Sequence, residues 1–110
     1  MRSLPNKFLA AMIALKALPG APKYNGNLTT VIDSALSDLN LYKKYKVDAI
    51  ILENDNDVPY MKPPLSKETL DAFEKIATEI RRHFNNPIGI QIMEGARLES
   101  LRIAKNADLD

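Results

Sequence analysis

An acidic segment directly follows an apolar one in the middle of this chain. Residues 49–60 read AIILENDNDVPY, so Glu53, Asp55 and Asp57 alternate with carboxamides immediately after the apolar residues. Alternate side chains of an extended chain point to the same side, and carboxylate oxygens suit Mg²⁺ or Ca²⁺. A metal site is therefore one interpretation. The calcium-loop pattern is incomplete, because no glycine follows the third acid and Pro59 interrupts the segment.

Two other interpretations of the acidic segment compete with a metal site. Asn and Asp side chains often satisfy the backbone of a solvent-exposed turn, so the segment could be an ordinary surface loop. Alternatively, Glu53 or Asp57 could contact a substrate or act as a general acid–base group. The sequence alone leaves all three open. No motif requires a cofactor, and we expect none, with Mg²⁺ at these carboxylates as the alternative.

Length and charge exclude several classes of protein. The chain has 110 residues, which is the size of one domain. Its 15 basic and 14 acidic residues leave a net charge of +1, so no global field favours nucleic acid or an anionic membrane. The absence of cysteine excludes disulfides and thiolate sites and fits a reducing compartment, so we expect a cytoplasmic protein. No apolar stretch approaches the roughly 20 residues of a membrane-spanning helix.

Apolar runs of strand length alternate with stretches of helical period along the chain. Strands are predicted over residues 8–15, 47–52 and 88–93, with a fourth beginning at 107–110, and helices over residues 28–45, 66–84 and 97–105. Asn27 or Thr29 is expected to cap the first helix, and Ser66 the second. Strands that alternate with helices in this way predict an α/β fold of parallel βα units with right-handed crossovers.

Two further predictions concern the helix faces. Arg81 and Arg82, near the end of the second helix, are expected on its polar, solvent-exposed face. In the third helix, the spacing predicts that Leu98, Leu101 and Ala104 are buried.

Parallel α/β proteins place their functional groups in the loops that follow the carboxyl ends of the strands. In this chain those positions are Lys16 with the turn at residues 18–20, the acidic segment, and residues 93–95. We therefore expect all three to meet at one rim of the sheet. Lys16 could bind an anionic substrate group there, or form an ion pair with Glu53.

Three segments of the sequence together resemble the BtpA family, which is named for a photosystem I biogenesis protein. They are Leu18-Pro-Gly-Ala-Pro-Lys-Tyr24, then Val47-Asp-Ala-Ile-Ile-Leu-Glu-Asn54 with Asp57-Val-Pro-Tyr60, and finally Gly89-Ile-Gln-Ile-Met93 with Gly95-Ala96. The resemblance implies a (β/α)₈ barrel and a family linked in cyanobacteria to the stabilisation of photosystem I. Most members have no established reaction, and some relatives are described as nucleosidase-like or phosphate-sugar-barrel-like.

The resemblance also implies a set of rim residues. They are Pro19, Gly20, Glu53, Asn54, Asp57 and Gln91. Of these, Glu53 and Asp57 are the catalytic candidates. The other four are substrate-binding candidates, together with Lys16, which its position after the first strand suggests. Three positions depart from the family pattern. Lys16 and Asn56 stand where histidines are expected, and Arg97 stands where asparagine is usual. Two potential imidazole ligands or acid–base groups are therefore missing, which argues against both a catalytic and a metal-binding role.

A barrel of this class needs roughly 250 residues. We therefore expect residues 1–110 to form a single, truncated barrel domain that pairs with itself or with the remaining part of a barrel. Its expected function is binding or assembly. The alternatives are an enzyme acting on a phosphorylated sugar or nucleoside-like small molecule at the rim, or a product without independent activity. Neither nucleic acid binding nor a membrane span is expected.

Overall fold

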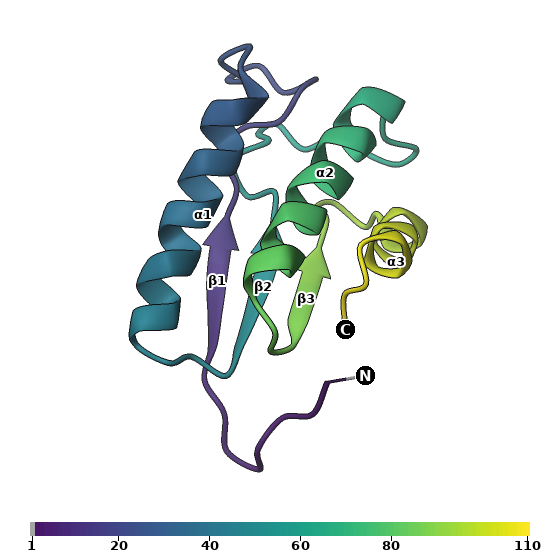
Figure 1. The fold of residues 1–110 in the computed structure, drawn as a ribbon. Coiled ribbons are helices and arrows are strands. Elements are labelled where there is room, and N and C mark those ends of the chain that lie inside the picture. Colours follow the sequence, from purple (N-terminus) through teal and green to yellow (C-terminus); the bar gives the residue numbers. More distant parts are fainter. Residues whose placement is uncertain (1) are drawn as a thin grey trace.

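Three short strands alternate with three helices along the chain (Figure 1). The computed structural model describes residues 2–110. Its elements are β1 (Ala10–Ala14), α1 (Leu28–Lys44), β2 (Ala49–Glu53), α2 (Lys67–His83), β3 (Ile88–Gln91) and α3 (Arg97–Asn106). Six of the seven predicted elements are confirmed, although each of the three strands is shorter than its apolar run.

The sheet carries its strands in sequence order, β1-β2-β3, and both pairs are parallel. Right-handed crossovers that always step in the same direction place their helices on the same face of a sheet. Figure 1 shows this arrangement, with α1 and α2 in front of the strands and α3 beside β3. The structure therefore confirms the predicted α/β architecture of parallel βα units, with its helices on one side.

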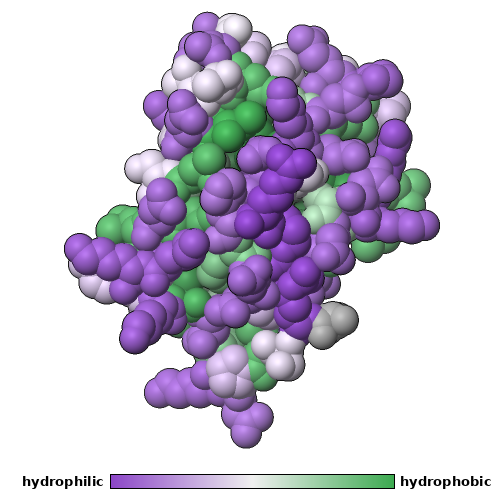
Figure 2. All heavy atoms as spheres, viewed as in Figure 1, coloured by the Kyte–Doolittle hydropathy of each residue, from purple (hydrophilic) through white to green (hydrophobic). Residues whose placement is uncertain are grey.

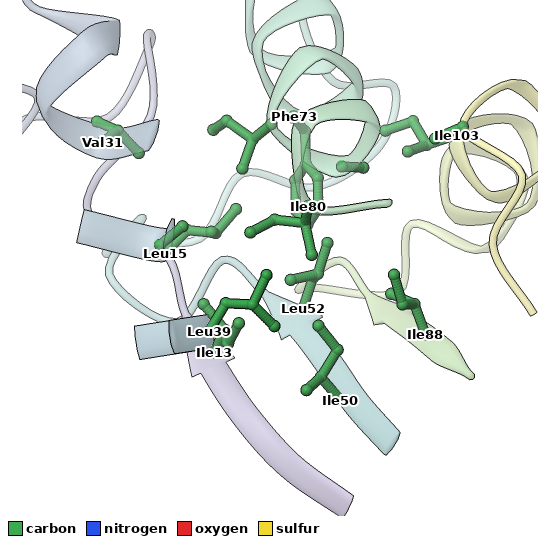
Figure 3. Packing of buried hydrophobic residues seen from close by; sticks show 14 of the residues in the cluster. Ile13, Leu15, Val31, Leu39, Ile50, Leu52, Phe73, Ile80, Ile88 and Ile103 are labelled. Carbon is green, nitrogen blue, oxygen red and sulfur yellow. The ribbon is translucent and has the colours of Figure 1, made fainter. Parts of the chain in front are cut away.

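The core lies between the sheet and these helices. Figure 3 shows strand side chains meeting helix side chains there: Ile13, Ile50, Leu52 and Ile88 from the sheet, and Val31, Leu39, Phe73, Ile80 and Ile103 from the helices. All of these side chains are almost completely buried. Burial of each such apolar side chain stabilises the fold by about 1.5–3 kcal/mol relative to exposure. On the same side, Figure 2 shows mainly hydrophilic residues at the surface, with hydrophobic ones in bands between them.

Both long helices begin at capping residues that the sequence predicted. Asn27 accepts a hydrogen bond from the Thr29 N–H at 3.0 Å, so it caps α1 rather than Thr29. Ser66 accepts one from the Thr69 N–H at 3.2 Å at the start of α2. Each cap satisfies a backbone donor that the helix itself leaves unpaired, which is typically worth about 1 kcal/mol.

The second face of the sheet is open. Met12, Ile51 and Gly89 lie side by side in the strand register and point away from the core. Met12 is exposed and the other two are half-buried. No helix of residues 2–110 packs on this face, so side chains at the carboxyl ends of the strands can project from it into solvent.

The prediction for α3 is wrong in part. Leu98 and Leu101 are 79% and 68% exposed, and Ala104 is half-buried. The side chain that α3 buries is Ile103, flanked by the buried Ala96 and Ala107. Both sets of positions recur at helical spacing, so periodicity alone does not decide which of them faces β3 and α2.

Residues 107–110 do not form the predicted start of a fourth strand, but Asp110 reaches the free edge of β3. Its N–H donates to the Ile88 carbonyl at 2.9 Å, and its carboxylate accepts the Ile88 N–H at 3.1 Å. These two bonds occupy the first backbone groups of an edge that would otherwise be unpaired.

The same carboxylate forms a shielded ion pair with Arg81, contrary to the predicted exposure of that arginine. Their side chains are 9% and 8% exposed and lie 3.0 Å apart. Arg81 also donates to the carbonyls of Phe84 and Asn86, and Arg2 pairs with Asp110 from the other terminus. Arg2, Arg81 and Asp110 thus form a cluster that joins both ends of the described chain near the amino ends of the strands. Arg82, as predicted, is exposed.

No helix among residues 2–110 combines the length and the hydrophobicity that crossing a membrane requires.

Replacement of Arg81 with Met should remove about 2 kcal/mol from the free energy of unfolding, because it removes the charged hydrogen bonds of Arg81 to Asp110 and to the carbonyls of Phe84 and Asn86, while Arg2 still pairs with Asp110. Arg82→Met is the matched control. Arg82 is 67% exposed and pairs with Glu79 at the surface, so its loss should cost less than about 1 kcal/mol. Urea denaturation at neutral pH measures both values, and equal losses would refute a special role for Arg81.

Candidate functional site

The loops after the three strands meet at the carboxyl ends of the sheet. The Leu15 N–H continues the β1–β2 ladder by donating to the Glu53 carbonyl at 2.9 Å. The loops that follow β1, β2 and β3 are then joined to one another by side chains of residues 54–57. The structure thus brings together the three segments that the sequence placed at a common rim.

Asn54 joins the β2 loop to the β3 loop. Its side chain is 3% exposed, accepts the Met93 N–H at 2.7 Å and donates to the Met93 carbonyl at 3.1 Å. It also donates to Asp57 at 3.3 Å. A carboxamide is suited to this position because it offers an acceptor and two donors at once.

Asp57 and Asn56 join the β2 loop to the β1 loop. Asp57 is 7% exposed and accepts the Leu18 N–H at 2.8 Å, and Asn56 donates to the Leu15 carbonyl at 2.8 Å. Asn56 therefore serves a structural purpose at a position where a histidine was expected. Sequence reasoning missed these contacts, although the dense run of short polar side chains is typical of loops that bind backbone groups.

The environment of Asp57 changes its titration. Burial raises the pKa of the carboxyl group above its ordinary value, while the hydrogen bonds from the Leu18 N–H and the Asn54 amide oppose that rise. The net effect is a raised pKa. A carboxylate that is hydrogen-bonded on both oxygens and closely covered is held in one orientation.

Glu53 and Gln91 point in a different direction from Asn54 and Asp57. They are partners in the β2–β3 register, with Ala14 opposite Glu53 on β1. By strand alternation this row lies on the open face of the sheet. Glu53 is half-buried and Gln91 is exposed, and the small Ala14 leaves room beside them. A carboxylate and a carboxamide thus lie next to each other where a ligand could reach them.

Lys16 is exposed at the start of the β1 loop. The ion pairs found within residues 2–110 do not include it, so the predicted pair between Lys16 and Glu53 is not formed. Its ammonium group is therefore available to an anion.

Pro19 and Gly20 position the start of α2. The Pro19 carbonyl accepts the Thr69 hydroxyl at 2.6 Å. Gly20 has φ of 97°, and a Cβ atom there would lie 2.9 Å from the same hydroxyl oxygen. Only glycine fits this combination of backbone conformation and close approach.

A small pocket of about 110 Å³ opens between these loops. Its walls include Gly20, Asn54, Asp57, Thr69 and Met93. Of the predicted site residues, Gly20, Asn54 and Asp57 line this pocket, whereas Glu53 and Gln91 lie on the open face. A larger groove of about 700 Å³ lies between α2 and α3, and none of the predicted site residues lines it.

The three carboxylates of the acidic segment do not converge. Asp57 turns to Leu18, Asp55 accepts the Tyr60 hydroxyl at 2.9 Å, and Glu53 lies on the open face. Within residues 2–110, no group of three or more His, Cys, Asp or Glu side chains is arranged to hold a metal ion.

Comparison with known proteins gives a consistent answer. The BtpA family model matches residues 5–110. An uncharacterised protein of Pyrococcus horikoshii is 41% identical over 105 residues, which cover 96% of this chain and 40% of that protein. An uncharacterised mitochondrial protein of Caenorhabditis elegans is 33% identical over 104 residues, covering 90% of this chain and 38% of that protein.

A third relative, an uncharacterised protein of Archaeoglobus fulgidus, is 35% identical over 104 residues, with 94% and 42% of the two chains covered. The chain thus spans about two fifths of the length of the curated relatives that it matches. No solved structure shows significant similarity to it. Because the family model covers nearly every residue, this chain belongs to the BtpA family.

Proposed function

We propose that this chain forms the first three βα units of a (β/α)₈ barrel and that its function is binding, both of further barrel units and of a small polar ligand. The observation that carries the proposal is the row of Glu53 and Gln91 on the helix-free face. In a closed barrel that face becomes the interior, and the carboxyl ends of the strands form the rim where such folds bind ligands.

The rim residues differ in whether neighbouring loops already bind their polar atoms, and this difference supports ligand contact by Glu53 and Gln91 on the open face. Asn54 and Asp57 use their polar atoms on neighbouring loops, so they act as positioning residues. Among residues 2–110, no hydrogen bond or ion pair connects the side chains of Glu53, Gln91 and Lys16 with one another. Glu53 can accept hydrogen bonds from hydroxyl groups, and the free Lys16 ammonium can hold a phosphate.

The assembly part of the proposal rests on the open face and edges of the sheet. An uncovered sheet face that carries a large apolar side chain such as Met12 at its surface is prone to associate. The relatives carry more than half of their length outside the match, which is room for the remaining units of a barrel. The photosystem I association implied by the family resemblance would be one form of such an assembly role.

The enzymatic alternative uses the same rim. There, Glu53 would act as the acid–base group on a phosphorylated sugar or nucleoside-like molecule, with Lys16 on the phosphate. The geometry favours binding over catalysis, because Asp57, the second catalytic candidate, is held by Leu18 and Asn54 and is closely covered. Mg²⁺ would enter only together with a phosphorylated ligand.

The assembly proposal predicts that the isolated chain self-associates through its open sheet face. Sedimentation velocity over a range of concentrations should show oligomers, and Met12→Lys should weaken them by placing a charge on that face. Leu41→Lys is the matched control, because it makes the same kind of change at an exposed apolar position of α1, away from the open sheet face. A single monomeric species at every concentration, or a larger effect of the control, would contradict the proposal.

The ligand proposal predicts that Glu53→Gln weakens binding of whichever sugar phosphate or nucleoside stabilises the wild-type chain. Loss of hydrogen bonds to a charged group should weaken binding by about tenfold or more. Thermal-shift titrations with and without Mg²⁺ provide the measurement. Asp33→Asn removes a carboxylate from the exposed side of α1 and should leave affinity unchanged. If both variants retain full affinity, the ligand does not bind at Glu53.

The raised pKa of Asp57 predicts a pH-dependent stability. Between the unfolded pKa of about 3.9 and the higher folded value, the native state binds more protons than the unfolded state. The stability contribution of Asp57 is therefore complete below this window and decreases as pH rises through it. The difference in unfolding free energy between wild type and Asp57→Asn should fall with pH in urea titrations. A difference that rises with pH would show that the hydrogen bonds outweigh burial.

A further inference from the structure

The β1–α1 loop contains an asparagine–glycine pair, Asn25-Gly26, that takes no part in the candidate site. Asn25 is exposed. Gly26 has φ of 84°, and a Cβ atom built on it would meet no heavy atom within 4 Å. Gly26 is also exposed, and it has no side chain that could crowd the backbone nitrogen between the two residues.

A hydrogen bond activates the Asn25 side chain towards attack by that nitrogen. The Asn27 N–H donates to Asn25 Oδ1 at 2.9 Å. Donation to this oxygen draws electron density from Cγ. It would also stabilise the negative charge that develops on the oxygen when a nucleophile adds to the amide, as an oxyanion-hole donor does.

We propose that Asn25 is a site of spontaneous deamidation. The Gly26 backbone nitrogen forms a bond to Asn25 Cγ, and the bond from Cγ to the side-chain nitrogen breaks. That nitrogen leaves as ammonia, taking up the proton displaced from the Gly26 amide, and a succinimide ring remains. Water then opens the ring at either carbonyl and gives an aspartyl or an isoaspartyl residue. The sequence of steps consumes one water and needs no oxidant, metal or cofactor.

The two products would affect α1 differently. An aspartate at position 25 places a carboxylate next to a helix whose first turn contains no acidic residue, and negative charge is favourable at that end. An isoaspartyl linkage adds a methylene to the backbone just before Asn27. Since Asn27 caps α1 through the Thr29 N–H, this product moves the cap and loosens the start of the helix.

Peptide mapping by mass spectrometry of the full chain, aged at mildly alkaline pH, tests the proposal. Asn40 is the internal control, because it is also exposed but lies within α1, where the backbone must open before the following nitrogen can attack. Local helix opening costs free energy, so Asn25 should deamidate at least about tenfold faster than Asn40. Part of the product should carry the isoaspartyl linkage.

The variant Gly26→Ala should slow the reaction, because a Cβ atom crowds the attacking nitrogen. Equal rates at Asn25 and Asn40 would overturn the proposal. So would an unchanged rate in Gly26→Ala together with a product free of isoaspartate, because direct hydrolysis of the side-chain amide would then explain the loss of ammonia.

Discussion

The handedness of the β–α–β connection is the constraint on which the rest of this structure depends. With the strands laid down in the order β1-β2-β3, right-handed crossovers leave no alternative to placing the helices on one side. One face of every strand is then buried in an apolar core, while the other face stays open. The open face in turn makes Glu53 and Gln91 accessible and exposes Met12. Both parts of the proposed function, ligand binding and assembly, arise from this one-sided coverage.

Polar contacts fix the two ends of the sheet for different purposes. At the amino ends, the Arg81–Asp110 ion pair, joined by Arg2, ties the termini together. At the carboxyl ends, Asn54 and Asp57 link each loop to the next. The Asn54–Met93 and Asp57–Leu18 contacts each span 39 residues, which is one βα repeat. Loops held in this way present the open-face residues on a rigid base, which is what a binding site requires.

Membership of the BtpA family agrees with this architecture but does not by itself assign an activity, since the relatives named above are uncharacterised. The polar groups of the rim are divided between contacts to neighbouring loops and exposure to solvent. Asn56 binds the Leu15 carbonyl, and Lys16 is exposed and takes part in none of the ion pairs found within residues 2–110. The rim therefore has a carboxylate, a carboxamide and an ammonium group as its available polar groups, a set that suits recognition of a hydroxylated anion.

The sequence by itself determined three strands and three helices, the Ser66 cap of α2 and the rim at which polar groups meet, because these follow from local periodicity, capping chemistry and strand direction. It left Asn27 and Thr29 as alternative caps of α1, and the strand predicted at residues 107–110 does not form. The sequence did not determine which face of α3 is buried, because Leu98 and Leu101 recur at helical spacing just as the buried positions do. Likewise, Arg81 resembles its neighbour Arg82 until Asp110 is brought against it. The acidic segment shows the same limit most clearly. Its carboxylates could bind a ligand, solvent or backbone, and the choice depends on contacts with residues one βα repeat away in the sequence. Only the tertiary structure brings the Leu18 N–H against Asp57 and leaves Glu53 on the open face.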